Sequence, residues 1–78
     1  MYIIFKDTPY SQTAIQKLVA MDSMINVDRN TVSVIVKTTN EIVGTISIVE
    51  KRMKVWKAGN PNNHIYIDFK DLVSVHEL

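Results

Sequence analysis

The sequence predicts an α+β fold, in which an N-terminal helix packs on a bent, five-stranded antiparallel sheet. Apolar residues near the N-terminus recur at the spacing of one helical face. From position 31 to position 76, short segments rich in β-branched residues alternate with turn-forming residues. Two neighbouring hairpins in that region also agree on which face of the sheet is apolar. A bent sheet of this kind either stays open or closes into a small barrel.

The helix is predicted over residues 9–24. Thr8 is a candidate N-cap, with Ser11 as an alternative one turn later, and Pro9 is tolerated at the first helical position. The apolar side chains that follow lie at positions 14, 15, 18, 19, 21, 24 and 25, which is the spacing of one buried helical face. The apolar run at residues 2–5 is a candidate for an extra strand, and residues 26–30 are predicted to form a connector.

The five strands are predicted at residues 31–37, 42–50, 53–57, 64–69 and 72–76. Side chains alternate across a strand, so residues that face each other across a hairpin must share a face. A turn centred on Lys51 and Arg52 joins the second and third strands, and a turn centred on Pro61 joins the third and fourth. Both turns lead to one apolar face, formed by Ile46, Ile48, Met53, Val55, Ile67 and Phe69.

The first two strands are predicted to pair as a hairpin. A loop at residues 39–41 places Val36 opposite Gly44, whose lack of a side chain suits a bend in the sheet. An open sheet of short strands leaves unpaired edges, and such edges invite pairing between chains. We therefore predict a homo-oligomer, most simply a symmetric dimer.

The opposite face of the second and third hairpins carries the candidate binding surface. In the predicted registers Trp56 lies beside Tyr66 and Lys54 beside Asp68, and both pairs are favourable cross-strand neighbours. Residues 51–58 hold four basic residues and no acidic residue. The residues predicted to contact a partner are Lys54, Trp56, Tyr66, Lys37 and Arg52.

This surface has three interpretations. Aromatic side chains flanked by basic residues can stack nucleic-acid bases and follow phosphates. The same residue types are common at protein–protein hot spots. In the third interpretation the N-terminal strand or helix covers Trp56 and Tyr66, so that both residues belong to the core.

Catalytic and metal-binding patterns are absent from the sequence. His64 and His76 are its only histidines, and they stand 12 residues apart without a cysteine or a carboxylate cluster. With only two glycines, the chain has no glycine-rich loop of the kind that binds phosphate. We therefore predict a protein that is not an enzyme and that takes no metal and no cofactor.

The charge and hydropathy of the 78 residues predict one domain without a membrane segment. The net charge of +1 argues against general affinity for nucleic acid. No apolar run approaches the ~20 residues that span a bilayer. Residues 1–7 lack the basic flank and long apolar run of a signal peptide, and there is no cysteine. We therefore expect a cytoplasmic protein.

Two short patterns resemble a known family. The segment Ile-Val-Gly-x-Ile at residues 42–46 and the closing segment Ile-x-Phe-x-Asp-Leu at residues 67–72 flank a basic-apolar strand. Across residues 31–76 this arrangement resembles the Sm-type small barrel, and it is similar to the C-terminal part of the YolD-like proteins of Gram-positive bacteria and their phages. The Asp-Gly and Arg-Gly or Lys-Gly signatures of the Sm RNA-binding loops are missing, so the resemblance implies the barrel fold rather than RNA binding.

We predict a non-enzymatic module that binds another protein. The resemblance implies the context of a phage or mobile-element regulator or inhibitor of a host protein. The alternative is an Sm-like nucleic-acid-binding protein that uses the basic-aromatic hairpin. Binding to short RNA or DNA separates the two, because phosphate contacts make affinity fall steeply with salt.

Overall fold

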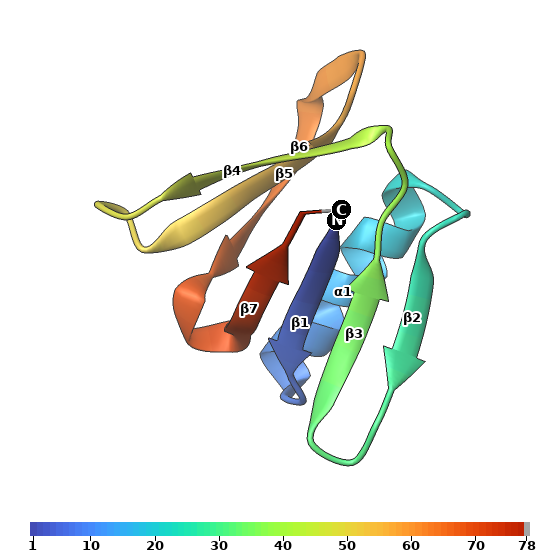
Figure 1. Cartoon of the computed structure of the whole chain (residues 1–78). Helices are drawn as coiled ribbons and strands as arrows, with labels where there is room; N and C mark the ends of the chain where they lie inside the picture. The colour runs from blue at the N-terminus through green and yellow to red at the C-terminus, as the bar shows by residue number, and fades with distance from the viewer. Residues whose placement is uncertain (78) are drawn as a thin grey trace.

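The computed structural model describes residues 1–77 and has the predicted α+β class (Figure 1). Within that range the chain forms one α-helix and seven strands in two antiparallel sheets. The prediction of one five-stranded sheet is corrected by this count, and the described strands do not close into a barrel. The elements are, in order, β1 (Tyr2–Lys6), α1 (Pro9–Met21), β2 (Asn26–Arg29), β3 (Ser33–Lys37), β4 (Ile42–Ser47), β5 (Arg52–Lys57), β6 (Asn60–Asp68), the short 3₁₀ turn η1 (Phe69–Asp71) and β7 (Leu72–His76).

Helix α1 begins with a capping box formed by Thr8 and Ser11, which confirms its predicted start. The Ser11 amide donates to Thr8 Oγ1 over 3.1 Å, and the Thr8 amide donates to Ser11 Oγ over 3.0 Å. Pro9 occupies the first turn, where a helix needs no N–H donor. Ser11 is fully buried, and its hydroxyl also donates to the carbonyl of Lys6. The start of the helix is thereby tied to the end of β1.

Helix α1 ends at Met21, earlier than the predicted residue 24, because Asp22 stops it. Asp22 has an extended backbone, and its carboxylate accepts hydrogen bonds from the Met24 amide over 2.9 Å and from the Thr39 hydroxyl over 2.7 Å. Both bonds favour the charged form and lower the pKa of the Asp22 carboxyl group, with the Met24 amide having the larger effect. This carboxylate therefore ties the end of the helix to the corner between β3 and β4.

The stability of the fold is expected to depend on the charge of Asp22. A carboxyl group whose pKa is lower in the folded chain stabilises the fold above its unfolded pKa of about 4, and this contribution is lost as the pH falls through the folded pKa. Asp22→Asn keeps the shape but cannot ionise. The difference in unfolding free energy between wild type and this variant should therefore shrink from about pH 5 to about pH 2. Urea unfolding at several pH values measures it, and a constant difference would contradict this role.

Strand β1 lies inside the four-stranded sheet, whose order is β2-β3-β1-β7. Its inward side chains, Ile3 and Phe5, lie opposite Val36 and Val34 of β3, and all four are fully buried. The other neighbour of β1 is β7, from the far end of the chain. The candidate strand at residues 2–5 is therefore central to the sheet rather than an addition to it.

The partners of β3 correct the predicted first hairpin. This strand pairs with β2 and β1 and not with β4, so Val36 does not face Gly44. The predicted connector at residues 26–30 contains β2. After β3 the chain turns at Thr38, whose amide donates to the Met1 carbonyl over 2.9 Å, and then enters the second sheet.

The three-stranded sheet, with the order β4-β5-β6, keeps the predicted faces of its strands but not the predicted registers. Val55 lies opposite Gly44, where the sequence predicted Ile48, a difference of four positions. On the other side it lies opposite Ile65, where the sequence predicted Ile67, a difference of two. Because an even shift leaves each side chain on its own face, the inward face of β5 and β6 is as predicted.

The turn between β4 and β5 explains the larger shift. It occupies residues 48–51 instead of centring on Lys51 and Arg52, and Lys51 adopts a left-handed φ of 55°. The hairpin therefore projects beyond the core. Ile46 keeps the predicted face but is 56% exposed, and Ile48 lies in the turn and is 80% exposed, so the prediction that both belong to the core is wrong.

The core lies where α1 and the inner faces of the two sheets meet. In Figure 1, α1 covers the four-stranded sheet from behind, and the strands of the second sheet cross those of the first at an angle. Gly44 permits a close approach of β4 to this core, since a Cβ atom there would lie 2.5 Å from Cε of Met53. The buried apolar residues are Met1, Ile3, Phe5, Ile15, Leu18, Met21, Ile25, Val34, Val36, Ile42, Met53, Val55 and Ile67.

Candidate functional site

Side chains of β5 point away from the core wherever their neighbours point into it. Met53 and Val55 are buried, so Arg52, Lys54 and Trp56 lie on the outer face of the three-stranded sheet. The paired strand β6 contributes two further ring side chains to the same face. We name this surface the cation–aromatic face, and it consists of Arg52, Lys54, Trp56, His64 and Tyr66.

Cations lie over the aromatic rings of this face. The guanidinium carbon of Arg52 is 3.8 Å from the centre of the Tyr66 ring, and the ammonium nitrogen of Lys54 is 5.5 Å from the centre of the Trp56 ring. The His64 ring meets the Tyr66 ring edge-on, at 5.3 Å between centres and 80° between planes. Each cation–π contact contributes ~0.5–1 kcal/mol at an exposed site. The face therefore has a defined arrangement in the free protein.

The cross-strand neighbours on this face differ from the predicted ones. Trp56 lies opposite His64, and Lys54 lies opposite Tyr66, so the predicted Trp56–Tyr66 pair is not formed across the strands. The shift of two positions between β5 and β6 accounts for this. His64 was not among the residues predicted for the site, although its even spacing from Tyr66 already placed both residues on one face.

Lys37 does not belong to the cation–aromatic face. It lies on β3 in the four-stranded sheet, where its ammonium nitrogen is 5.8 Å from the centre of the Tyr2 ring. Its predicted place near Lys54 depended on a β3–β4 hairpin that the chain does not form. The other four predicted residues do share one face.

The aromatic residues of the face lie outside the hydrophobic core. Tyr66 is 45% exposed, and Trp56 is half-buried among its sheet neighbours. Neither residue belongs to the cluster of buried side chains that α1 and β1 complete. The arrangement therefore disfavours the interpretation in which the N-terminal segment buries both rings.

Carboxylates neutralise part of the positive charge around the face. Glu50 Oε2 lies 2.7 Å from Arg52 Nε, and Glu41 Oε2 lies 3.4 Å from Lys57 Nζ. Among residues 1–77, Lys54 forms no ion pair. The net positive charge of the face is therefore small, and most of its side chains are aromatic.

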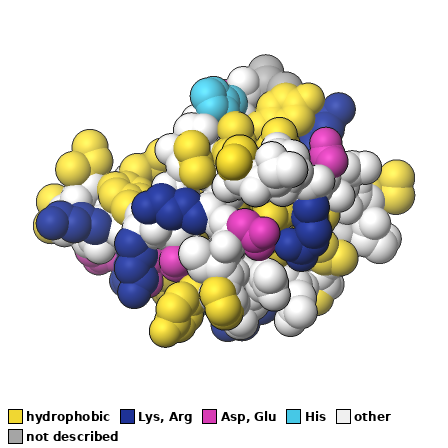
Figure 2. Space-filling model, turned by 90° about the horizontal axis from the view of Figure 1, so that it is seen from below, with side chains coloured by type: hydrophobic (Ala, Val, Ile, Leu, Met, Phe, Trp, Pro, Cys, Tyr) yellow, Lys and Arg dark blue, Asp and Glu magenta, His cyan; other side chains and the backbone are white. Residues whose placement is uncertain are grey.

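An apolar projection adjoins the face at the β4–β5 turn. Ile48 and Val49, in this turn, are 80% and 93% exposed, and we name these two residues the hairpin tip. Figure 2 shows hydrophobic and basic side chains together at the end of the molecule where this hairpin projects. Exposed apolar clusters rimmed by polar residues are typical of contact sites.

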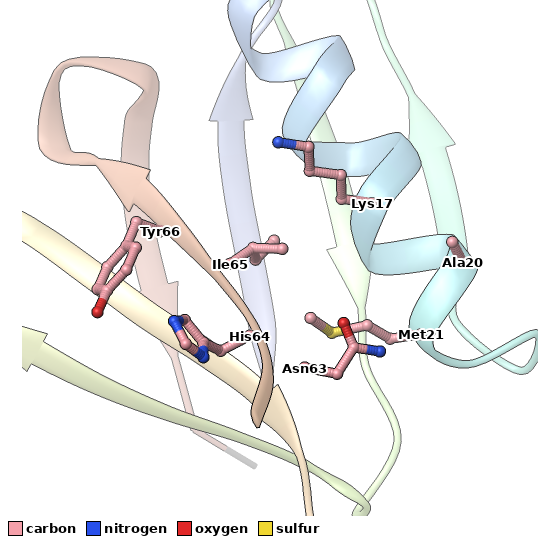
Figure 3. Close-up of a pocket in the computed structure, with 7 residues that line it drawn as sticks. All are labelled: Lys17, Ala20, Met21, Asn63, His64, Ile65 and Tyr66. Atoms are coloured by element: carbon pink, nitrogen blue, oxygen red, sulfur yellow. The ribbon is translucent and has the colours of Figure 1, made fainter. Parts of the chain in front are cut away.

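A groove of about 540 Å³ separates α1 from β6 beside the face. Figure 3 shows Lys17, Ala20 and Met21 on its helical side, and residues 63–66 on its strand side. His64 and Tyr66 belong both to the groove and to the cation–aromatic face. None of the described residues that line the groove is a carboxylate, so none there can pair with His64 for acid–base chemistry.

Within residues 1–77, no three His, Cys, Asp or Glu side chains gather so that they could hold a metal ion. Over the same range, the chain has no helix with the length and apolar character needed to cross a membrane. The structure thus describes a small α+β protein in which cations lie over aromatic rings on the outer face of one sheet.

Comparison with known proteins finds no match among family models, curated proteins or solved structures. The resemblance to Sm-type barrels and YolD-like proteins therefore stays a prediction.

Proposed function

We propose that this protein is a non-enzymatic module that binds another protein through the cation–aromatic face and the hairpin tip. The observation that carries this proposal is the Arg52–Tyr66 stack, in which the guanidinium carbon is 3.8 Å from the ring centre. This stack lies on the same three-stranded sheet as the exposed hairpin tip. Tyr, Trp and Arg are the residues that most often dominate the binding energy of protein interfaces.

The hairpin tip favours a protein partner over a nucleic acid. Ile48 and Val49 are exposed β-branched side chains, and burying their apolar surface contributes about 25 cal/mol per Å². A protein partner can offer an apolar pocket to such residues, whereas the phosphate backbone of a nucleic acid cannot. The carboxylates of Glu41 and Glu50 also reduce the positive charge that phosphate binding requires.

Occupying a partner's surface is the activity that this arrangement supports. A binding module of 78 residues regulates or inhibits its partner by covering a surface that the partner otherwise uses. Encoding by a phage or mobile element belongs to the same proposal, on the grounds of the sequence resemblance.

Nucleic-acid binding is the second candidate, and Lys54 is the observation that favours it. This lysine forms no ion pair within residues 1–77 and lies over Trp56, on a sheet face that also carries Tyr66. Single-stranded nucleic acids stack on such aromatic platforms beside basic residues. The proposed protein-binding function predicts no such complex.

Tyr66→Ala is expected to weaken partner binding by about 2 kcal/mol or more, which is roughly 30-fold. The partner is isolated by affinity capture from lysate of the native host, and its affinity is then measured by calorimetry. Tyr2→Ala is the matched control, because Lys37 lies 5.8 Å from that ring on the other sheet. Equal losses in both variants would show that the cation–aromatic face is not the contact surface.

Fluorescence anisotropy with short single-stranded RNA and DNA separates the two candidate functions. A nucleic-acid site should lose affinity steeply between about 50 mM and about 200 mM salt. Binding with that salt dependence, lost in Tyr66→Ala, would replace the protein-binding proposal with the second candidate.

A further inference from the structure

Strand β4 is a sheet edge without the usual protection against pairing with another chain. In residues 1–77 the edge strands of the two sheets are β2, β7, β4 and β6. β2 carries Asp28 and Arg29, β6 carries Pro61 and Asp68, and β7 has an irregular register with β1. Charges, proline and bulges are the features that protect edges. β4, with the sequence Ile-Val-Gly-Thr-Ile-Ser, has neither a charge nor a proline.

Alternate peptide groups of β4 point away from β5. The Ala58 amide donates to the Glu41 carbonyl over 2.7 Å, and these two residues continue the β4–β5 register. In an antiparallel pair, residues that exchange hydrogen bonds alternate with residues that do not. The odd-numbered residues of β4 therefore direct their peptide groups to β5, and the even-numbered residues direct theirs to the open side. In the described chain, the Ile42 amide is one of these outward groups, and it already donates a hydrogen bond to the Thr39 carbonyl over 3.2 Å.

We propose that this edge pairs with the same edge of a second copy of the chain, as antiparallel strands related by a two-fold axis at Gly44. The outward peptide groups of Gly44 then face those of the second copy's Gly44. On the inner face Ile46, which is 56% exposed in the single chain, lies opposite the second copy's Ile42. On the outer face Val43 lies opposite Thr45. β-Branched cross-strand pairs of this kind are favourable neighbours.

The charges at the two ends of β4 favour a second copy over an unrelated strand. Glu41 precedes β4, and Glu77 lines a groove of about 230 Å³ beside its first residues. Lys51 lies in the turn that follows β4 and forms no ion pair within residues 1–77. Glu41 pairs with Lys57, and Glu50 of the same turn pairs with Arg52. Glu77 and Lys51 are therefore the charges near the ends of β4 that form no ion pair within residues 1–77. Antiparallel pairing brings the Glu77 end of each strand towards the Lys51 turn of the other copy. Symmetry repeats this complementary contact at both ends of the interface.

Pairing through β4 joins two three-stranded sheets into one continuous sheet. A two-fold axis perpendicular to the sheet keeps the outer faces of both copies on one side, so the two cation–aromatic faces lie on the same surface. A partner with two binding sites can then engage both copies at once. This inference goes beyond the proposed function and does not depend on it, because self-association needs no other partner.

Sedimentation velocity of the full chain tests the pairing. A β-edge interface is small, so we expect monomers of 8.9 kDa at about 1 µM and dimers at about 200 µM. Ile46→Lys places a charge on the edge and should raise the dissociation constant at least ~tenfold. Val73→Lys is the matched control, since Val73 is a 58% exposed residue on β7, an edge strand of the other sheet, and this variant should still dimerise. A wild type that stays monomeric, or a dimer that Ile46→Lys leaves intact, would overturn the proposal.

A spin label tests the register. The chain has no cysteine, so Thr45→Cys can carry a single nitroxide. In the proposed register the two labelled residues are diagonal neighbours, about 7–8 Å apart. The spectrum should therefore broaden strongly at dimer-forming concentrations, whereas a label at Thr13 on α1 should not broaden. Broadening at Thr13 with none at Thr45 would place the interface elsewhere and overturn the proposal.

Discussion

Replacing Phe5 with alanine is expected to destabilise the protein by about 3–5 kcal/mol, the range for removing a buried aromatic side chain. Phe5 is fully buried on β1, opposite Val34 of β3 on one side and Leu72 of β7 on the other. Two strands from distant parts of the chain, β3 and β7, therefore flank β1 at this residue. A domain of 78 residues has roughly 4–12 kcal/mol of stability in total. The variant should be largely unfolded at about 37 °C.

Urea unfolding followed by circular dichroism measures this loss. Tyr10→Ala is the control, because Tyr10 is an aromatic residue of α1 that is 74% exposed, and its removal should change stability by less than about 1 kcal/mol. A Phe5→Ala variant as stable as Tyr10→Ala would mean that residues 2–5 form a peripheral strand. The sequence alone allows this, since it predicts residues 2–5 only as an extra strand.

Replacing Ile67 with alanine is expected to destabilise the protein by about 2–5 kcal/mol. Ile67 is 1% exposed and lies opposite Met53 on the inner face of the three-stranded sheet. Tyr66, its neighbour on β6, points to the outer face and contacts Arg52. Tyr66→Ala removes that contact and should cost about 1 kcal/mol. The two variants therefore compare opposite faces of a single strand.

Thermal melting distinguishes these two variants directly. One kcal/mol shifts the Tm of a domain this size by about 4–8 °C, so Ile67→Ala should melt at least about 8 °C below wild type. Thr45→Ala, at an exposed position on β4, is a second control that should be near neutral. A larger loss for Tyr66→Ala than for Ile67→Ala would show that the faces of β6 are reversed.

The helix start and the faces of the hairpins could be predicted from the sequence because both are local properties. Thr8 and Pro9 specify the start of α1 through one capping side chain and one missing N–H. Side-chain alternation is a property of the extended backbone, so it placed Val55 on the inner face and Lys54 and Trp56 on the outer face without knowledge of the register. For the same reason the sequence placed Lys54, Trp56 and Tyr66 together on the outer face, although His64 was left out and Lys37 was wrongly included.

The tertiary structure decided which strands pair and how the registers align. Local patterns predicted a hairpin between β3 and β4, in which Val36 would have faced the bare backbone of Gly44. Pairing β3 with β1 instead places Val36 opposite Ile3, and both side chains become fully buried. The same choice moved Lys37 away from the candidate site and made residues 2–5 central to a sheet. The composition and alternation of a strand are set by its own residues, but its partner depends on the apolar surface that segments far apart in the chain can bury together.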